Sequence, residues 1–271
     1  MINHRSVGAL ALIAILASPA AAAAPLQPTS KWVVDFAANQ CTAARSYGTE
    51  DKPLTLVLKP AVLGDVMTLA ILRNGTVPGV KQHMVAITLD NGPPINTSLL
   101  AFSPKGQKRR VEMVNLPLDT IASVRRSSRL SLDGTGIARR SFALNGMAAV
   151  TKALDICLAD LQKYWNVGGA VPGGLKAVAS SKKPLSTLFE PGDYPQVALR
   201  GQQSGMVAFA LLIDENGKLA DCTVVETSGV AMLDSQSCAI INERAAFLPA
   251  VGADGKPARS SLMQRVRWQL P

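Results

Sequence analysis

The stretch "SGMVAFALLIDENGKLADCTVVET", residues 204–227, determines the fold of the second half of the chain. Its first half is a run of apolar residues, the polar turn "ENG" follows at 215–217, and a second run of strand-forming residues returns after the turn. This pattern predicts a β-hairpin. Side chains alternate along a strand, so Ala220, Cys222 and Val224 are expected to share one face.

A helix and a third strand are predicted after the hairpin. The stretch "MLDSQSCAIINERAAF" at 232–247 has the helical pattern, and its inward side would be formed by Leu233, Cys238, Ile241 and Ala245. The last run, "SSLMQRVRWQL" at 260–270, alternates apolar and polar residues as a half-buried strand does. Residues 191–271 are therefore expected to form a ββαβ domain, with a three-stranded antiparallel sheet packed on a helix.

The first half of the chain is predicted to be mostly β, which makes the whole protein α+β. Turn residues separate short apolar runs, which are found at 54–59, 66–73, 83–90, 109–115, 128–132 and 139–144. A short helix is expected at 116–126, and a long amphipathic helix closes this N-terminal domain, residues 31–165. The long helix carries one apolar stripe, formed by Met147, Val150, Leu154, Cys157, Leu158, Leu161 and Trp165.

A length of 271 residues suits two modest domains. Between the two predicted domains, residues 166–190 are rich in Gly, Pro, Ser and Lys and show no sustained periodicity. We interpret this segment as a linker.

The N-terminus resembles a secretory signal peptide, residues 1–24. A short basic start at His4 and Arg5 precedes an apolar run at 7–17, and an Ala-rich stretch ends before Pro25. These are the three regions of such a peptide, and they predict export to the periplasm. The alternative is an uncleaved membrane anchor, because residues 7–24 just reach the length that a spanning helix needs.

The mature chain keeps four cysteines, Cys41, Cys157, Cys222 and Cys238. An exported protein meets an oxidising environment, where thiols pair. Cys41 and Cys157 bracket the first domain, whereas Cys222 and Cys238 lie close together in the second, so we expect one disulfide within each. The absence of a C-x-x-C pair and the single remaining histidine do not suit a zinc site.

The C-terminal residues resemble the C-terminal domain of the TonB family of periplasmic energy transducers. The matching positions, in order, are Tyr194-Pro195, Ala198, Gly205-x-Val207, Ile213-Asp214-x-x-Gly217, Ser228-Gly229, Leu233-Asp234 and Phe247-x-Pro249-Ala250. The resemblance covers residues 191–271, and the N-terminal domain resembles no family that we recognise.

The resemblance implies a binding module that holds a short segment of an outer-membrane receptor, with a link to transport across the Gram-negative envelope. TonB-family domains offer their last strand to such a partner, which here implies Leu262, Gln264, Arg265, Val266, Arg267 and Trp268. Two copies pairing through the same edge, a homodimer, is the alternative.

Energy transduction is a less favoured interpretation. The family's membrane helix carries a histidine within its apolar span, whereas His4 precedes the run here. The linker has a coil span of about 30 Å, which is short for crossing the periplasm. Contact with a membrane is therefore expected only if residues 1–24 are not cleaved.

The sequence offers no convincing catalytic set, and we expect neither an enzyme nor a cofactor. His83 is the only histidine of the mature chain, no G-x-S-x-G elbow is present, and Cys222 has a bonding partner in Cys238. Asp214 and Asp221 flank the hairpin turn, where aspartates are ordinary. An unrecognised hydrolase is the remaining enzymatic alternative.

The chain is basic, with a formal net charge of +9. Nine positive side chains crowd into one part of the first domain, namely Lys105, Lys108, Arg109, Arg110, Arg125, Arg126, Arg129, Arg139 and Arg140. A solvated basic face is the ordinary interpretation. The alternative function is binding of anionic cell-envelope material through this face. Nucleic acid is not expected, because aromatic residues make up only 4% of the chain and offer few stacking platforms.

Overall fold

The structure is a computed structural model that describes residues 24–63, 66–167 and 174–270. Nearly all of the expected signal peptide lies outside the described residues. None of the helices within these ranges is long and apolar enough to cross a membrane.

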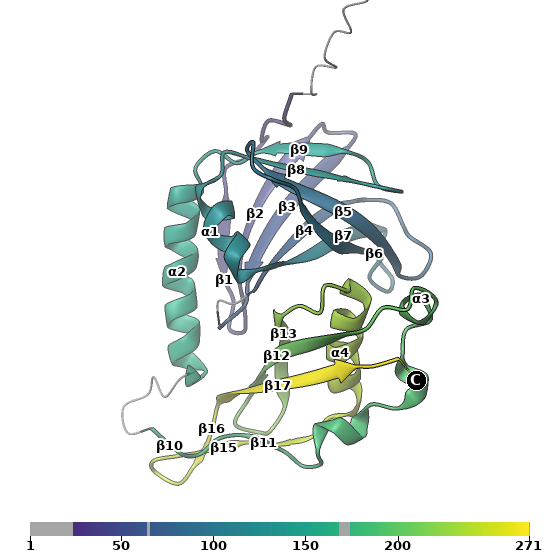
Figure 1. Ribbon diagram of the computed structural model, residues 1–271. Coiled ribbons are helices and arrows are strands. Elements are labelled where there is room, and N and C mark those ends of the chain that lie inside the picture. The colour runs from purple at the N-terminus through teal and green to yellow at the C-terminus, as the bar shows by residue number, and fades with distance from the viewer. Residues whose placement is uncertain (1–23, 64–65, 168–173, 271) are drawn as a thin grey trace, which may run out of the picture.

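The N-terminal domain is a curled antiparallel sheet of nine strands (Figure 1). In sheet order the strands are β1-β2-β3-β4-β7-β6-β5-β8-β9. Their bounds are β1 Val33–Phe36, β2 Cys41–Gly48, β3 Pro53–Pro60, β4 Val66–Asn74, β5 Lys81–Leu89, β6 Ile95–Phe102, β7 Arg109–Pro117, β8 Arg129–Gly134 and β9 Arg140–Ala143. The six strands predicted for this domain are present. The strands β1, β2 and β6 were not predicted, because polar residues or alanine interrupt their short apolar patterns.

A segment ahead of β1 joins the two ends of this sheet. The Leu26 N–H donates to the Ser141 carbonyl of β9 at 2.7 Å, and the Thr29 N–H donates to the Ser46 carbonyl of β2 at 2.9 Å. The Tyr47 hydroxyl donates to the Ala143 carbonyl at 2.8 Å, so β2 also reaches β9 directly. These contacts join β9 to β2 and close the curled sheet into a barrel, so the outer edge of β9 is not left open. This closing segment lies ahead of residue 31, where the first domain was expected to begin.

Two helices complete this domain, α1 Leu118–Arg126 and α2 Met147–Tyr164. All seven residues of the predicted apolar stripe, from Met147 to Trp165, are buried in the barrel core. The predicted disulfide between Cys41 of β2 and Cys157 of α2 is present, with a Cα–Cα distance of 6.0 Å. The helix is thus held on the barrel by both its apolar stripe and a covalent bond.

The C-terminal domain has the predicted ββαβ order. Its sheet runs β13-β12-β17, all antiparallel, and α4 packs on one face. The bounds are β12 Gly205–Ile213, β13 Leu219–Glu226, α4 Ala231–Arg244 and β17 Ser260–Trp268, preceded by α3 Gln196–Arg200. The predicted Cys222–Cys238 disulfide joins β13 to α4 at a Cα–Cα distance of 5.7 Å.

The hairpin turn is built by Asp214 and Gly217. The Asp214 carboxylate accepts hydrogen bonds from the N–H groups of Asn216 at 2.9 Å and Lys218 at 2.8 Å. Gly217 has a φ of +75°, and an added Cβ would meet the Phe247 carbonyl oxygen at 2.6 Å. Only glycine fits this position, so the turn sets the register of the hairpin.

The expectation that Ala220 shares a face with Cys222 is wrong. The register of β12 against β13 shifts between Leu212 and Ile213, which pairs Cys222 with Leu211 but Leu219 with Ile213. This bulge turns Ala220 toward the barrel core, while Cys222 packs on the α4 side.

The barrel packs on the second face of the C-terminal sheet at β12 and β13. Ala208, Ala210 and Val225 pack with Ala61 and Val66 of the barrel domain. The Asn39 amide donates to the Ala220 carbonyl at 3.0 Å, which adds a polar contact between the domains. Strand β12 is consequently buried on both faces, which agrees with its nearly continuous apolar sequence.

The segment expected to be a linker, residues 166–190, contains regular structure. Short strands β10 Leu175–Ala177 and β11 Ser180–Ser181 pair with β15 Ala250–Gly252 and β14 Phe247–Leu248, and η2 Leu185–Leu188 and η3 Pro191–Asp193 follow. A further short strand, β16 Pro257–Ala258, pairs with β15. Strands of two or three residues are too short for periodicity to reveal, and the partners of β10 and β11 lie about seventy residues further along the chain.

Candidate protein-interaction site

Strand β17 forms one edge of the C-terminal sheet (Figure 1). It pairs with β12 at nine positions, from Gly205 opposite Trp268 to Ile213 opposite Ser260. Its other side has no strand partner within the described residues. A free edge presents alternate backbone N–H and C=O groups to solvent, which can pair with another extended chain.

The side chains of β17 alternate as the sequence predicts. Leu262, Val266 and Trp268 pack into the core beneath α4. Met263 is 48% exposed, and Arg265 and Arg267 are also exposed. A shallow hollow of about 500 Å³ opens beside Met263, Gln264 and Arg265. All six residues predicted for partner binding therefore lie on β17. Three of them, Leu262, Val266 and Trp268, pack in the core and are not available as side chains to a partner.

Both ends of β17 are held in place. The Trp268 indole N–H donates to the Ser237 hydroxyl of α4 at 2.9 Å, and the ring meets Phe189 and Tyr194 edge-on at 5.6 and 5.3 Å. At the other end, the buried Ser260 hydroxyl accepts the Ala179 N–H at 3.0 Å. The strand is thus a fixed template before any partner arrives, which lowers the entropy cost of binding.

The two arginines of the edge have different electrostatic surroundings. The Arg265 guanidinium lies 3.3 Å from the Glu226 carboxylate, with Ala208 of the central strand between them in the register. Arg267 has no ion-pair partner among the described residues. The positive charge available to a partner is therefore greatest at Arg267.

Asp234 holds the loop between β13 and α4. Its carboxylate accepts hydrogen bonds from the Ser228 N–H at 2.9 Å, the Ser228 hydroxyl at 2.7 Å and the Thr227 hydroxyl at 2.5 Å. The Asn115 amide of β7 lies 3.5 Å from the same carboxylate. Burial raises the pKa of Asp234, while the hydrogen bonds from Thr227 and Ser228 oppose that shift. Ser228 of the Ser-Gly motif and Asp234 of the Leu-Asp motif are thus hydrogen-bonded to each other.

The residues considered for catalysis make separate, local contacts. Asp214 accepts bonds within its turn, and Asp221 lies 3.6 Å from the Lys59 ammonium and accepts the Thr223 hydroxyl. His83 is exposed, with its Nδ1 3.2 Å from the Thr135 carbonyl oxygen. Within the described ranges, no three His, Cys, Asp or Glu side chains are grouped as a metal site.

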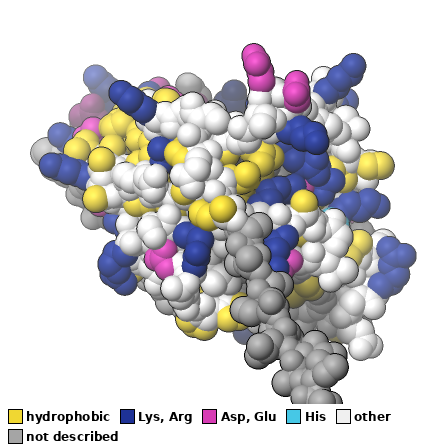
Figure 2. All heavy atoms as spheres, turned by 90° about the horizontal axis from the view of Figure 1, so that it is seen from above, with side chains coloured by type: hydrophobic (Ala, Val, Ile, Leu, Met, Phe, Trp, Pro, Cys, Tyr) yellow, Lys and Arg dark blue, Asp and Glu magenta, His cyan; other side chains and the backbone are white. Residues whose placement is uncertain are grey.

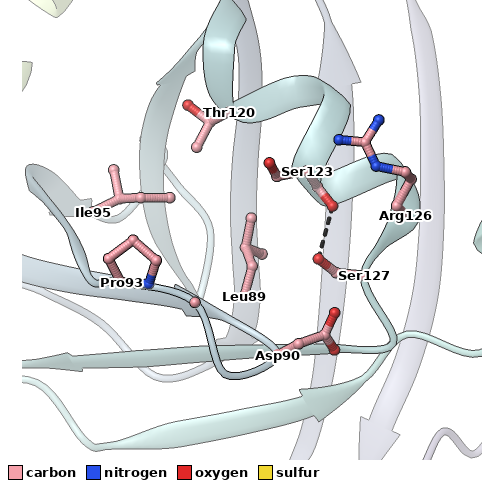
Figure 3. Close-up of a pocket in the computed structure, with 9 residues that line it drawn as sticks. Leu89, Asp90, Pro93, Ile95, Thr120, Ser123, Arg126 and Ser127 are labelled. Atoms are coloured by element: carbon pink, nitrogen blue, oxygen red, sulfur yellow. Dashed lines mark hydrogen bonds between the residues drawn. The ribbon is translucent and has the colours of Figure 1, made fainter.

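A hollow of about 360 Å³ lies between α1 and the turn that follows β5 (Figure 3). It is lined by Leu89, Asp90, Gly92, Pro93, Ile95, Thr120, Ser123, Arg126 and Ser127. The Ser128 hydroxyl and the N–H groups of Ser128 and Arg129 donate to Asp90 and lower the pKa of this carboxyl. The Ser127 hydroxyl donates to the Ser123 carbonyl. These polar groups support the surrounding loops, and no sequence pattern indicated the hollow.

The clustered basic residues of the first domain have different ion-pair partners. Arg125 pairs with Asp155 at 2.7 Å, and Arg139 pairs with Asp133 at 2.8 Å. Arg110 and Arg140 instead converge on a buried glutamate, as described below. Figure 2 shows Lys and Arg side chains gathered on the barrel end that faces away from the C-terminal domain.

Comparison with known proteins agrees with the geometry of the C-terminal domain. Residues 190–270 match the family model described as Gram-negative bacterial TonB protein C-terminal. The match includes the hairpin, α4 and the edge strand β17, and it leaves the barrel outside. Searches of the curated proteins and of the solved structures each return no match. Residues 190–270 are therefore a C-terminal domain of the TonB family, which this chain carries behind a closed β-barrel.

Proposed function

We propose that this protein is a periplasmic binding protein that takes up a segment of a partner protein as an additional strand beside β17. The observation that carries the proposal is the free edge of β17, which is paired on one side and held at both ends. Main-chain hydrogen bonds along such an edge supply affinity, while the side chains supply selectivity. The TonB family match supports a role in envelope transport.

The disulfides support the proposed compartment. All four cysteines of the chain are paired, one bond in each domain. Such bonds persist in the periplasm and are rare in the reducing cytoplasm. The expected signal peptide would deliver the chain there.

The two faces of the C-terminal sheet are poor alternatives to its edge. Helix α4 covers one face, and the barrel covers the β12 and β13 part of the other. Of the two outer strands of the sheet, β13 and β17, it is β17 that is held at both ends, by Ser260 and Trp268, and that carries the positions that the family resemblance assigns to a partner. An extended segment with an acidic residue opposite Arg267 fits this edge best, because that guanidinium has no ion-pair partner among the described residues.

The proposal can be tested by placing a photo-crosslinking amino acid at Met263 in cells that export the protein. Met84, which is 56% exposed on the barrel strand β5, is the matched control. We expect a cross-linked partner at Met263 and none at Met84. An adduct of twice the chain mass would instead show that two copies pair through this edge.

Proline substitutions distinguish backbone pairing from side-chain contact. Consecutive N–H groups of a strand point to opposite sides, so Arg265→Pro and Val266→Pro remove one outward donor and one donor of the β12 ladder between them. The variant that loses the N–H on the outer side of β17 should keep its fold and no longer cross-link at Met263. Normal cross-linking by both folded proline variants would exclude strand addition. Arg265→Ala should reduce capture only modestly, and mainly at low salt.

A further inference from the structure

A buried glutamate lies inside the barrel near the end that faces away from the C-terminal domain. Glu112 of β7 is 0% exposed, and it lies opposite Ile71 of β4. Its inward neighbours along β7 are the core residues Val114 and Leu116. An isolated carboxylate at such a position would be costly, so it requires positive partners.

Three arginines from three strands surround Glu112. The distances from its carboxylate are 3.2 Å to Arg73 of β4, 2.6 Å to Arg110 of β7 and 2.5 Å to Arg140 of β9. In the sheet order, β6, β5 and β8 separate β7 from β9. The contact from Arg140 therefore crosses the interior of the barrel instead of passing along the sheet.

This cluster has three positive charges and one negative charge. Burial alone would raise the pKa of Glu112, but Arg140, followed by Arg110 and Arg73, outweighs burial and holds that pKa below its usual range. The glutamate is therefore ionised at neutral pH. Positive charge remains in excess in a partly desolvated place, where an added anion interacts more strongly than it does in water.

The arginines also keep unused donors. A guanidinium has five N–H groups, and Arg73 and Arg140 donate to no acceptor other than Glu112 in the described part of the chain. The side chains of Arg73, Arg110 and Arg140 are 31, 19 and 9% exposed, so a ligand can reach the cluster from solvent. A hollow of about 290 Å³ adjoins Arg73, and its other polar lining residues are Asp51, Lys52 and Asn74.

We propose that this arginine cluster is a binding site for a phosphate monoester. Glu112 fixes the three guanidinium groups from inside, and their outer N–H groups face the ligand. A phosphate monoester carries close to two negative charges at neutral pH and presents three acceptor oxygens. It thus balances the excess charge of the cluster and matches the forked donors of arginine better than a carboxylate, which has one charge. The site is independent of the proposed partner strand, since β17 lies at the opposite end of the molecule (Figure 1).

The first test measures binding of inorganic phosphate to the full mature protein by calorimetry, with chloride at equal ionic strength as the reference. The variant is Arg73→Gln. Arg73 is the most exposed of the three arginines, so its substitution should lower the stability of the fold least. The matched control is Arg139→Gln, which removes the same charge from a surface arginine next to Arg140. We expect saturable binding by wild type and control, and binding about tenfold weaker or worse in Arg73→Gln. Equal binding by both variants would overturn the proposal.

A second measurement does not depend on the folding of any variant. Arginine side chains of the wild-type protein are labelled with ¹⁵N, and their Nε–H resonances are followed during phosphate titration. A small set of resonances that shift together to saturation supports the cluster as the site. Small, unsaturable shifts of all arginines would show only diffuse attraction and refute it.

The source of the phosphate group can be distinguished with vesicles. Phosphatidylcholine vesicles with and without phosphatidate are sedimented with the wild-type protein and both variants. Capture by phosphatidate that Arg73→Gln abolishes and free phosphate competes away supports a lipid headgroup. Binding of phosphate without capture by vesicles supports a soluble phosphate ester. Equal loss of capture in Arg73→Gln and Arg139→Gln indicates nonspecific attraction and argues against the site.

Discussion

Removing the Cys41–Cys157 disulfide should destabilise the protein more than removing Cys222–Cys238. The two bonds close chain segments with separations of 116 and 16 residues. In the loop-entropy model, a cross-link restricts the unfolded chain more as the loop grows, which gives about 5 kcal/mol for the long loop and about 3 kcal/mol for the short one. The structure adds to this difference, because Cys41 and Cys157 are 0 and 2% exposed between β2 and α2.

The perturbations are two double variants, Cys41→Ala with Cys157→Ala and Cys222→Ala with Cys238→Ala. Alanine in the fully buried pair leaves a small cavity, whereas the other pair is only partly buried and loses less packing. The difference in unfolding free energy between the double variants should therefore be about 2 kcal/mol or more.

Urea denaturation under non-reducing conditions measures this difference. Far-UV circular dichroism follows the whole chain, and Trp268 fluorescence follows the C-terminal domain in a variant that keeps it as the only tryptophan. The wild-type protein treated with a reductant serves as a control for both bonds together. Equal losses, or a larger loss for the short loop, would refute the assignment of the stabilisation to loop length.

Three further perturbations test the buried contacts. Asp234→Ala leaves the donors of the β13–α4 loop without an acceptor and should cost about 3 kcal/mol, measured by chemical denaturation, while an unchanged stability would mean that water replaces the carboxylate. Leu26→Pro removes the N–H that donates to β9 and should cost about 1 to 2 kcal/mol, with faster amide exchange in β9; normal exchange there would show that the closing segment is dispensable. Glu112→Gln should cost about 3 kcal/mol at neutral pH. Because the pKa of Glu112 is lowered in the folded state, its contribution is present above its ordinary pKa and is lost as the pH falls through the folded value. Melting temperatures of wild type and Glu112→Gln should therefore converge in acid, and a difference that stays constant with pH would contradict the ionised cluster.

Much of the C-terminal domain could be predicted because its determinants are local. Asp214 and Gly217 specify a turn within four residues, and the alternation from Leu262 to Trp268 specifies the face that β17 turns to the core. The stripe of α2 likewise repeats at the helical period, so its buried side follows from the sequence. The cysteine pairs also follow from the sequence, since each pair brackets or lies within one predicted domain.

The sequence did not reveal which face Ala220 takes or that Leu26 pairs with the barrel strands. A bulge shifts the register of β13, and this shift depends on how the whole hairpin packs between α4 and the barrel. Leu26 lies in a short segment with no strand pattern of its own, and it becomes part of the barrel only because β9 and β2 present free edges on either side. Its pairing with β9 depends on a partner more than a hundred residues away, which no local pattern can indicate.

The edge strand and the arginine cluster show the same contrast between local sequence and tertiary structure. The sequence by itself determined that β17 alternates between core and solvent, since each residue takes its side from its immediate neighbours. Only the tertiary structure decided that β17 has a free outer edge and that Arg73, Arg110 and Arg140 meet at Glu112. Strand order and barrel closure bring together side chains whose positions in the chain have no common period. Periodicity records which face a residue turns to the core, but it contains no information about which distant strand lies opposite.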